Sequence, residues 1–266
     1  MILYVTDSNS FDRYIIMDDK KYLYFDTETT DIQTKDIVQL GMLGDNDYPY
    51  FNEYFKPLQR IEFGSMAIHH ITPEFVEDKP IFTEATAPKE GMDIRFTGES
   101  LMEYLQFLAD NYIWVAHNAA FDLEALAKKG IHIKNYICTF KLARNMLTDD
   151  TGRDLESYSL QYLRYYLGLY RNEDATHNVA HDAMSDVFFL RDLFHYLLEH
   201  STLSNENMMI ISKEPAIMRN LTFGKYSGAT IEEIAKTDRE YLEWVVNTIE
   251  DKPDLVWNIK RVLSNV

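Results

Sequence analysis

Short hydrophobic runs separated by turn residues organise the first part of the chain. One run begins at Tyr22 and stops at two carboxylates, Asp26 and Glu28. Residues 37–43 and 49–55 form two further apolar runs, joined by the turn sequence Gly-Asp-Asn-Asp. Strands connected by such short turns pair antiparallel, so the pattern predicts a three-stranded meander. Residues 1–20 alternate apolar and polar, which predicts a strand or hairpin ahead of it.

The hydrophobic period changes from two to between three and four residues after residue 98. Residues 99–109 predict an amphipathic helix, and 112–116 a short buried strand. A helix that Gly130 ends, a strand at 136–139 and a helix to residue 147 follow. Strands separated by helices pair parallel. With helices at 159–169 and 181–200, the prediction is an α/β protein whose mixed sheet has three antiparallel strands, then parallel strands, and is flanked by helices.

Three remaining stretches are less regular. Residues 64–75 predict two short helical turns, with Ser65 capping the first and Thr72 the second. Residues 83–98 carry Pro and Gly residues and predict a long loop, with a small hairpin at 92–96. The polar segment 201–207 reads as a linker to a small unit with helical stretches at 230–236, 239–249 and 255–263.

Composition narrows the class of protein. The chain has 266 residues, is 46% hydrophobic and contains a single cysteine, Cys138, which excludes an intramolecular disulfide. No apolar run approaches the ~18 residues of a membrane helix. We therefore expect a cytoplasmic protein with no membrane partner. The net charge of −17 argues against a generic nucleic-acid coat, which needs a basic surface, although metal ions and a few local cations can still hold a polyanion.

Four carboxylates form the candidate chemical site. Asp26 and Glu28 are two residues apart in a predicted strand, so their side chains project to the same side. Two neighbouring carboxylates repel each other, so both stay ionised only where a cation lies between them or water reaches the site. The hard ions Mg²⁺ and Mn²⁺ prefer such oxygen ligands. Asp122 and Asp186 lie where further strands end or helices begin, which is where open α/β sheets place ligands.

The segment from His181 to Asp186 leaves one choice open. Positions five apart in a helix diverge by about 140°, so His181 faces the site of Asp186 only from a loop or first turn. Asp182 is four residues before Asp186 and shares its helical face, so geometry alone keeps it as a possible ligand. Its position favours the alternative, a helix N-cap.

The motifs resemble those of the DEDD exonuclease superfamily, in its DEDDh branch. The resemblance is carried by Phe25-Asp-Thr-Glu-Thr, His117-Asn-Ala-Ala-Phe-Asp, and His181 followed five residues later by Asp186. Met66-Ala-Ile-His-His-Ile-Thr and Ser159-Leu also resemble that branch, so the similarity covers residues 21 to 200 in order. Phe223-Gly-Lys-Tyr-Ser-Gly, with Tyr241-Leu-Glu-Trp, is similar to the small module of exonuclease X-like proteins.

This resemblance implies a ribonuclease H-like fold with a small C-terminal module. It implies that Asp26, Glu28, Asp122 and Asp186 hold two Mg²⁺ or Mn²⁺ ions, and that His181 and Glu28 are catalytic. His181 would be the general base that deprotonates water. The water would attack the terminal phosphodiester in line, and a nucleoside 5′-monophosphate would leave from the 3′ end.

Substrate contacts are predicted more loosely. The candidates share a place in or beside the family-like motifs: Thr27, Thr29, Met66, His69 and Asn118. Core packing for Met66, a core or surface position for His69 (or for its neighbour His70), and turn or cap duty for Asn118 are competing interpretations. Three basic residues could touch phosphates, although a solvated face is the simpler interpretation of each: Lys141, Arg144 and Lys225.

We expect an exonuclease domain at 1–204 and an exonuclease X-like module at 208–266. The predicted activity is metal-dependent 3′–5′ exonuclease action, with single-stranded DNA or DNA 3′ ends favoured because of the tail, and with DNA repair as a setting. The alternatives are RNA trimming and, in another class, non-catalytic nucleic-acid binding on a relict fold. We take loop 83–98 as a candidate for selecting the substrate.

Overall fold

The computed structural model describes residues 21–172 and 182–265. The strand or hairpin predicted within residues 1–20 lies outside the described residues, and so does His181.

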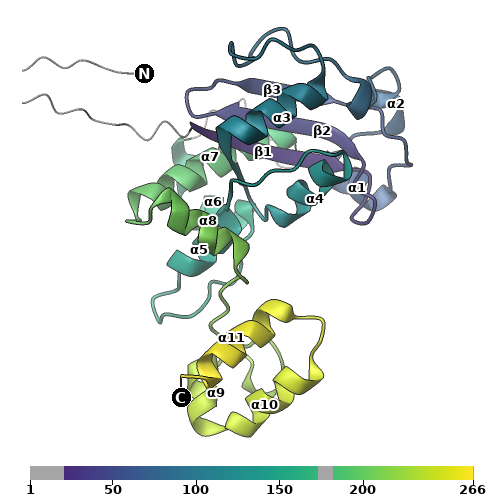
Figure 1. Cartoon of the computed structure of the whole chain (residues 1–266). Coiled ribbons are helices and arrows are strands. Elements are labelled where there is room, and N and C mark those ends of the chain that lie inside the picture. The colour runs from purple at the N-terminus through teal and green to yellow at the C-terminus, as the bar shows by residue number, and fades with distance from the viewer. Residues whose placement is uncertain (1–20, 173–181, 266) are drawn as a thin grey trace, which may run out of the picture.

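A five-stranded mixed sheet forms the centre of the protein (Figure 1). Its order is β3-β2-β1-β4-β5. The pairs β1–β2 and β2–β3 are antiparallel, whereas β1–β4 and β4–β5 are parallel. The prediction of three antiparallel strands followed by parallel ones is therefore confirmed. The strands are β1 (Lys21–Thr29), β2 (Ile37–Gly44), β3 (Tyr50–Tyr54), β4 (Tyr112–Ala116) and β5 (Tyr136–Cys138).

Helices cover both faces of the sheet. Buried residues of α3 (Leu101–Asn111) and α4 (Ala120–Lys128) pack on the face that Leu23 and Phe25 present. The opposite face, which Tyr24 presents, packs against three helices, α5 (Thr139–Met146), α6 (Leu160–Tyr166) and α7 (Ala183–Glu199). Since side chains alternate along β1, the carboxylates of Asp26 and Glu28 share the Tyr24 face and therefore the side of α7.

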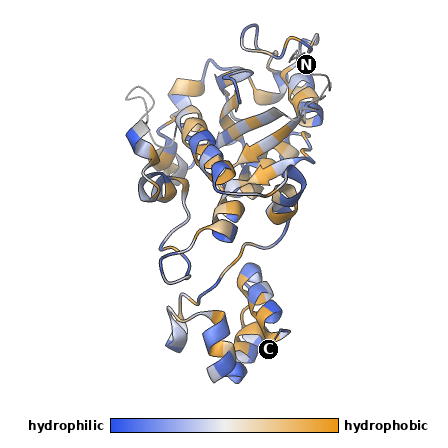
Figure 2. Ribbon diagram, turned by 90° about the vertical axis from the view of Figure 1, so that its left-hand side faces the viewer, coloured by the Kyte–Doolittle hydropathy of each residue, from blue (hydrophilic) through white to orange (hydrophobic). Residues whose placement is uncertain are grey.

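Hydrophobic residues concentrate in the sheet and on the helix sides that pack against it (Figure 2). The strand β2 is buried at every position, and β4 likewise. Over residues 21–172 and 182–265, no helix has the length and apolarity that crossing a bilayer requires.

Two short helices follow the meander, α1 (Phe63–His69) and α2 (Pro73–Val76). Thr72 caps α2 as predicted, because its side chain accepts the N–H of Phe75. Ser65 does not cap α1. The cap position is Glu62, which makes no side-chain cap hydrogen bond, so the helix begins earlier than the sequence suggested.

The loop at 83–98 is held by a buried acid rather than by a hairpin. Residues 92–96 form a turn in which Phe96 N–H bonds to Asp93 O, and the predicted strands are absent from it. The Asp93 carboxylate accepts from the Arg95 guanidinium at 2.6 Å and from the Tyr112 hydroxyl at 2.6 Å. Tyr112 pairs with Lys21, at the opposite end of β1 from Glu28. The Asp93 turn is therefore remote from the acidic residues, and a role of loop 83–98 in substrate selection stays a prediction.

The segment after α7 differs from the predicted linker. A helix, α8 (Asn205–Lys213), begins within it and packs against β5 and α5, with Met208 buried in the same cluster as α7. A separate hydrophobic cluster joins α9 (Ile231–Thr237), α10 (Arg239–Thr248) and α11 (Pro253–Leu263). We therefore propose that the C-terminal module begins after Lys213, later than the boundary at 204–208 that we expected.

A buried acid joins the module to the sheet domain. Asp154 accepts from the Arg144 guanidinium at 3.1 Å, and from the backbone N–H and guanidinium of Arg219 at 2.8 and 3.2 Å. Arg144 also donates to Ile217 O, and Lys141 donates to Ser212 O. Two of the three basic residues considered for phosphate contact therefore hold the segment that leads into the module. The third, Lys225, pairs with Asp238 inside it.

The anchoring of loop 83–98 can be tested with Asp93→Ala. The substitution leaves the buried Tyr112 hydroxyl and Asp93 turn without their partner, so we expect a loss of about 1–3 kcal/mol in unfolding free energy. Urea denaturation measures it. Because the turn is remote from the acidic site, we expect the variant to keep the native preference between single-stranded and duplex ends. A changed preference would support a role of this loop in substrate selection.

Candidate active site

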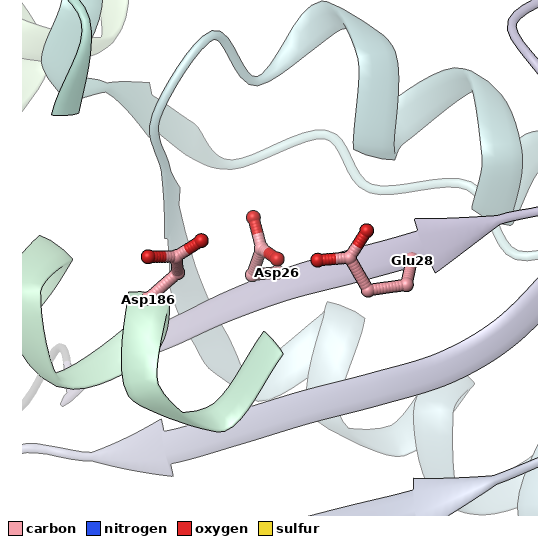
Figure 3. A group of neighbouring side chains, drawn as sticks. All are labelled: Asp26, Glu28 and Asp186. Atoms are coloured by element: carbon pink, nitrogen blue, oxygen red, sulfur yellow. The ribbon is translucent and has the colours of Figure 1, made fainter. Parts of the chain in front are cut away.

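Three carboxylates converge on one point beside the sheet (Figure 3). Asp26 and Glu28 extend from β1, and Asp186 extends from the first turn of α7. One oxygen from each carboxylate lies within 4.8 Å of the others. The spacing along β1 and the start of α7 thus bring together three of the four acids that the sequence singled out.

The approach of α7 depends on the strand beside β1. Asp26 pairs with Gly41 of β2, and Glu28 pairs with Gln39. A Cβ atom at Gly41 would lie 2.9 Å from the backbone carbon of Ala183, which is closer than real Cβ atoms come. The absent side chain therefore lets the first turn of α7 rest directly on β2. This contact is what brings Asp186 to the two carboxylates of β1.

Asp122 lies close by but is turned to another partner. It is buried in the first turn of α4, and its Oδ1 accepts the Thr27 backbone N–H at 3.1 Å and the Thr27 hydroxyl at 2.6 Å. It does not belong to the group of three within 4.8 Å. Because α4 packs on the other face of the sheet, Asp122 approaches from the side of Thr27. Its role as a ligand stays a prediction.

Burial and mutual repulsion make this site difficult to ionise. Burial, followed by the charges of Asp122 and Glu28, raises the pKa of Asp26 well above its ordinary value. Burial, followed by Asp186 and Asp122, raises the pKa of Glu28 to about 8. Burial raises the pKa of Asp122 to about 7, against the lowering effect of the hydrogen bonds from Thr27. A divalent cation among these oxygens would reverse the repulsion, and an all-carboxylate donor set suits Mg²⁺ or Mn²⁺.

Asp182 is the N-cap of α7, as its position indicated. Its Oδ2 accepts the Ser185 N–H at 3.1 Å, and its Oδ1 accepts from Gln39 at 2.8 Å. Asp182 is not in the group of three, although it shares a helical face with Asp186. Since α7 begins at Ala183, the predicted base His181 precedes the helix in the sequence and belongs to the residues that the structure does not describe.

Two supporting residues were not predicted from the sequence. Gln161 of α6 donates to Asp186 Oδ1 at 2.9 Å and accepts from Arg164 at 2.9 Å. His117 lies between the Thr139 hydroxyl and the Tyr158 carbonyl, at 2.9 Å from each. Burial lowers the pKa of His117 to about 4, so the ring is neutral and Nε2 donates to the carbonyl. In the sequence, only the position of Gln161 two residues after the family-like Ser159 could have indicated its role.

Of the predicted substrate residues, Thr27, Thr29 and His69 already have hydrogen-bond partners in the protein. Thr29 donates its hydroxyl to Asp31 O, and His69 is buried with its Nδ1 accepting the Ile71 N–H. Met66 is partly buried against the cluster that contains Ile71. Asn118 is exposed, with φ 57° at the turn before α4. Substrate contact by these residues, and by Thr27, stays a prediction.

The repulsion predicts an unusual effect of Glu28→Gln on stability in EDTA. A raised pKa means that folding is penalised as pH rises from about 4.5 towards the folded value of about 8. The variant removes this penalty. We therefore expect its unfolding free energy to exceed that of the native protein on the order of 1–3 kcal/mol at pH 9, and to match it at pH 5.

Urea denaturation at the two pH values measures the difference, with Glu53→Gln as the control. Glu53 is an exposed glutamate on β3, so its replacement should give the same change at both pH values. A Glu28→Gln variant that is destabilised at pH 9 would contradict the repulsion.

Two known protein families match segments of this chain. A family described as exonuclease matches residues 23–194. This segment contains β1, the sheet, and the helices that carry Asp122 and Asp186. A second family, described as exodeoxyribonuclease X-like C-terminal, matches residues 221–250 within the C-terminal module.

Two curated proteins and one solved structure are similar to this chain. Exodeoxyribonuclease 10 of Escherichia coli strain K12 is 26% identical over 90% of this chain and 97% of its own. DNA polymerase III subunit epsilon of Buchnera aphidicola from Acyrthosiphon pisum is 26% identical over 91% and 100%. A structure of exonuclease X with 5′ overhanging duplex DNA has a TM-score of 0.48 at 23% identity, covering 72% of this chain and 99% of that one.

The family match spans most of the chain and contains the three converging carboxylates. The predicted resemblance to the DEDDh exonucleases and the predicted ribonuclease H-like fold are thereby confirmed. The chain belongs to the exonuclease family, and its enzyme class is that of a 3′–5′ exonuclease.

Proposed function

We propose that the chain is a divalent-metal-dependent 3′–5′ exodeoxyribonuclease. It removes nucleoside 5′-monophosphates from DNA 3′ ends, and single-stranded ends are its favoured substrate. The observation that carries the proposal is the convergence of Asp26, Glu28 and Asp186 within 4.8 Å, inside a segment that matches the exonuclease family.

The choice of DNA rests on the relatives and the C-terminal module. The E. coli relative is named an exodeoxyribonuclease and is similar over 97% of its length. The module matches the family described as exodeoxyribonuclease X-like C-terminal. A second relative is a subunit of a DNA polymerase. These names favour DNA over RNA for this chain, and RNA trimming remains the second candidate because the acids themselves do not distinguish the sugar.

The acidic residues would hold two Mg²⁺ or Mn²⁺ ions, which in such sites stabilise the attacking and leaving oxygens of an in-line displacement. Asp26, Glu28 and Asp186 supply oxygens directly, and Asp122 supplies a fourth carboxylate whose Oδ1 is fixed by Thr27. Gln161 holds Asp186 Oδ1 in place. Glu28 would also help to bind the attacking water.

Proton transfer falls to His181 in this proposal. An imidazole with an ordinary pKa near neutrality accepts a proton from water efficiently at physiological pH. In the sequence, His181 directly precedes Asp182, the N-cap residue of the helix that carries Asp186. His117 does not compete for this role, since both its nitrogens are bonded within the protein.

The metal-site assignment can be tested with Asp26→Ala. Removing this carboxylate deletes one ligand from the centre of the group, so we expect Mg²⁺-dependent release of mononucleotides from a 3′-labelled strand to fall by at least about a thousandfold. Asp110→Ala, which removes an exposed carboxylate of α3, should retain native release. Equal release by Asp26→Ala and the native protein would refute the metal site, whereas no release by the native protein would support the non-catalytic alternative.

The polymer can be tested separately. Single-stranded and duplex DNA and RNA, each labelled at the 3′ end, are digested with Mg²⁺ or Mn²⁺. We expect DNA single strands to be degraded fastest and RNA at least about tenfold more slowly, and faster RNA degradation would establish an exoribonuclease instead.

A further inference from the structure

A buried glutamine connects the sheet to the end of α7. Gln39 of β2 is 1% exposed. Its Nε2 donates to Asp182 Oδ1 at 2.8 Å and to Asn52 Oδ1 at 2.9 Å, and its Oε1 accepts the Ala183 N–H at 3.3 Å. The amide has only one orientation that suits these partners, because the carboxylate requires a donor and the helix N–H requires an acceptor.

The same glutamine lies next to the acids. Gln39 is the cross-strand partner of Glu28, and Gly41 is the cross-strand partner of Asp26. Paired residues of antiparallel strands project to the same side, so the Gln39 side chain stands beside the Glu28 carboxylate. It nevertheless donates to Asp182 and Asn52. The glutamine therefore contributes no ligand atom to the group of three, and its bonds go to the helix that carries Asp186.

Within the group of three, this contact positions the only acid that β1 does not supply, Asp186. Asp26 and Glu28 are fixed relative to each other by their strand, whereas Asp186 depends on where the first turn of α7 rests. Gly41 lets α7 approach β2 closely, but a missing side chain cannot fix the orientation of the helix. Gln39 fixes that orientation because it binds the Ala183 N–H of the first turn and the carboxylate of the N-cap residue Asp182.

We propose that Gln39 is a positioning residue of this exonuclease. Its side-chain amide docks the amino end of α7 on β2, and this places the Asp186 carboxylate at the distance from Asp26 and Glu28 that binding of a divalent ion requires. The inference rests on the proposed metal-dependent function. It extends that function by naming a residue outside the acidic motifs on which metal affinity depends.

The physical basis is the penalty for misplacing a charged ligand. Supporting residues that orient metal ligands typically contribute 10–100-fold to metal affinity or activity. If α7 loses its attachment, the repulsion among the carboxylates favours movement of Asp186 away from Asp26. Docking by Gln39 opposes this movement with uncharged donors and one acceptor, so it adds no further negative charge to the site.

The test is direct titration with Mn²⁺, measured by calorimetry on the full chain. Gln39→Leu keeps a similar volume and removes all three hydrogen bonds, so we expect Mn²⁺ affinity to fall by about 10–100-fold. Asp182→Ser retains a capping hydroxyl but not the acceptor for Gln39. In the Asp182→Ser background, adding Gln39→Leu should weaken binding by no more than about threefold, because part of the docking contact is already lost.

Phe51→Leu is the matched control for a general loss of stability. Phe51 is buried on the face of the sheet away from α7, and its replacement by the smaller leucine weakens packing only there. We expect it to lower the urea midpoint while Mn²⁺ affinity stays native. Should Gln39→Leu fail to fold, Gln39→Asn, whose amide is one methylene shorter, is titrated instead with the same expected loss.

The outcomes separate the two proposals. If Asp26→Ala and the native protein bind Mn²⁺ equally, the metal site itself is wrong. If Asp26→Ala abolishes binding but Gln39→Leu binds as the native protein does, the positioning role alone is overturned. It is overturned as well if Phe51→Leu weakens Mn²⁺ binding as much as Gln39→Leu, or if the effect of Gln39→Leu is undiminished in the Asp182→Ser background.

Discussion

Electrostatic repulsion among carboxylates that are buried or partly buried is the constraint that the rest of the structure has to satisfy. Asp26, Glu28 and Asp186 converge within 4.8 Å, and the charge of Asp122 acts on both residues of β1. No hydrophobic gain arises from placing these groups together. The sheet and α7 therefore have to hold them there, and the cost is recovered only when a cation or a proton enters.

The protein meets this constraint by distributing the acids over rigid elements. Two come from one strand, whose alternation fixes their common direction. One comes from the first turn of a seventeen-residue helix that is packed along much of its length against Tyr24 and its neighbours. Asp122 comes from a helix on the other face and is bound by Thr27. Two uncharged residues hold Asp186 and its helix without adding charge: Gln161 donates to Asp186, and Gln39 donates to Asp182 at the start of α7.

The strands and most helices were predictable because their hydrophobic period is clear and turn residues mark their ends. The paired carboxylates were predictable for the same reason, since spacing of two in a strand has only one geometric meaning. The helix α8 was missed because its polar first turn, Asn205-Glu-Asn, resembles a linker, and only packing against β5 identifies it. The bond between Asp122 and Thr27 depends on side-chain rotamers, and the role of Gln39 depends on a helix 143 positions away; neither leaves a local pattern.

The joint around Asp154 has a practical consequence for dissecting this enzyme. Arg144 and Arg219 share one buried carboxylate, and Arg219 also donates to the carbonyls of Arg144 and Asn145 at the end of α5. A truncated chain that stops at Lys213 would lose Arg219 and Ile217, leaving Asp154 half-paired and Arg144 without one of its acceptors. A change in the activity of such a fragment would therefore reflect the lost contacts of Asp154 and Arg144 as well as the missing module. Surface substitutions in α9–α11 of the full-length chain test the contribution of the module without breaking these contacts.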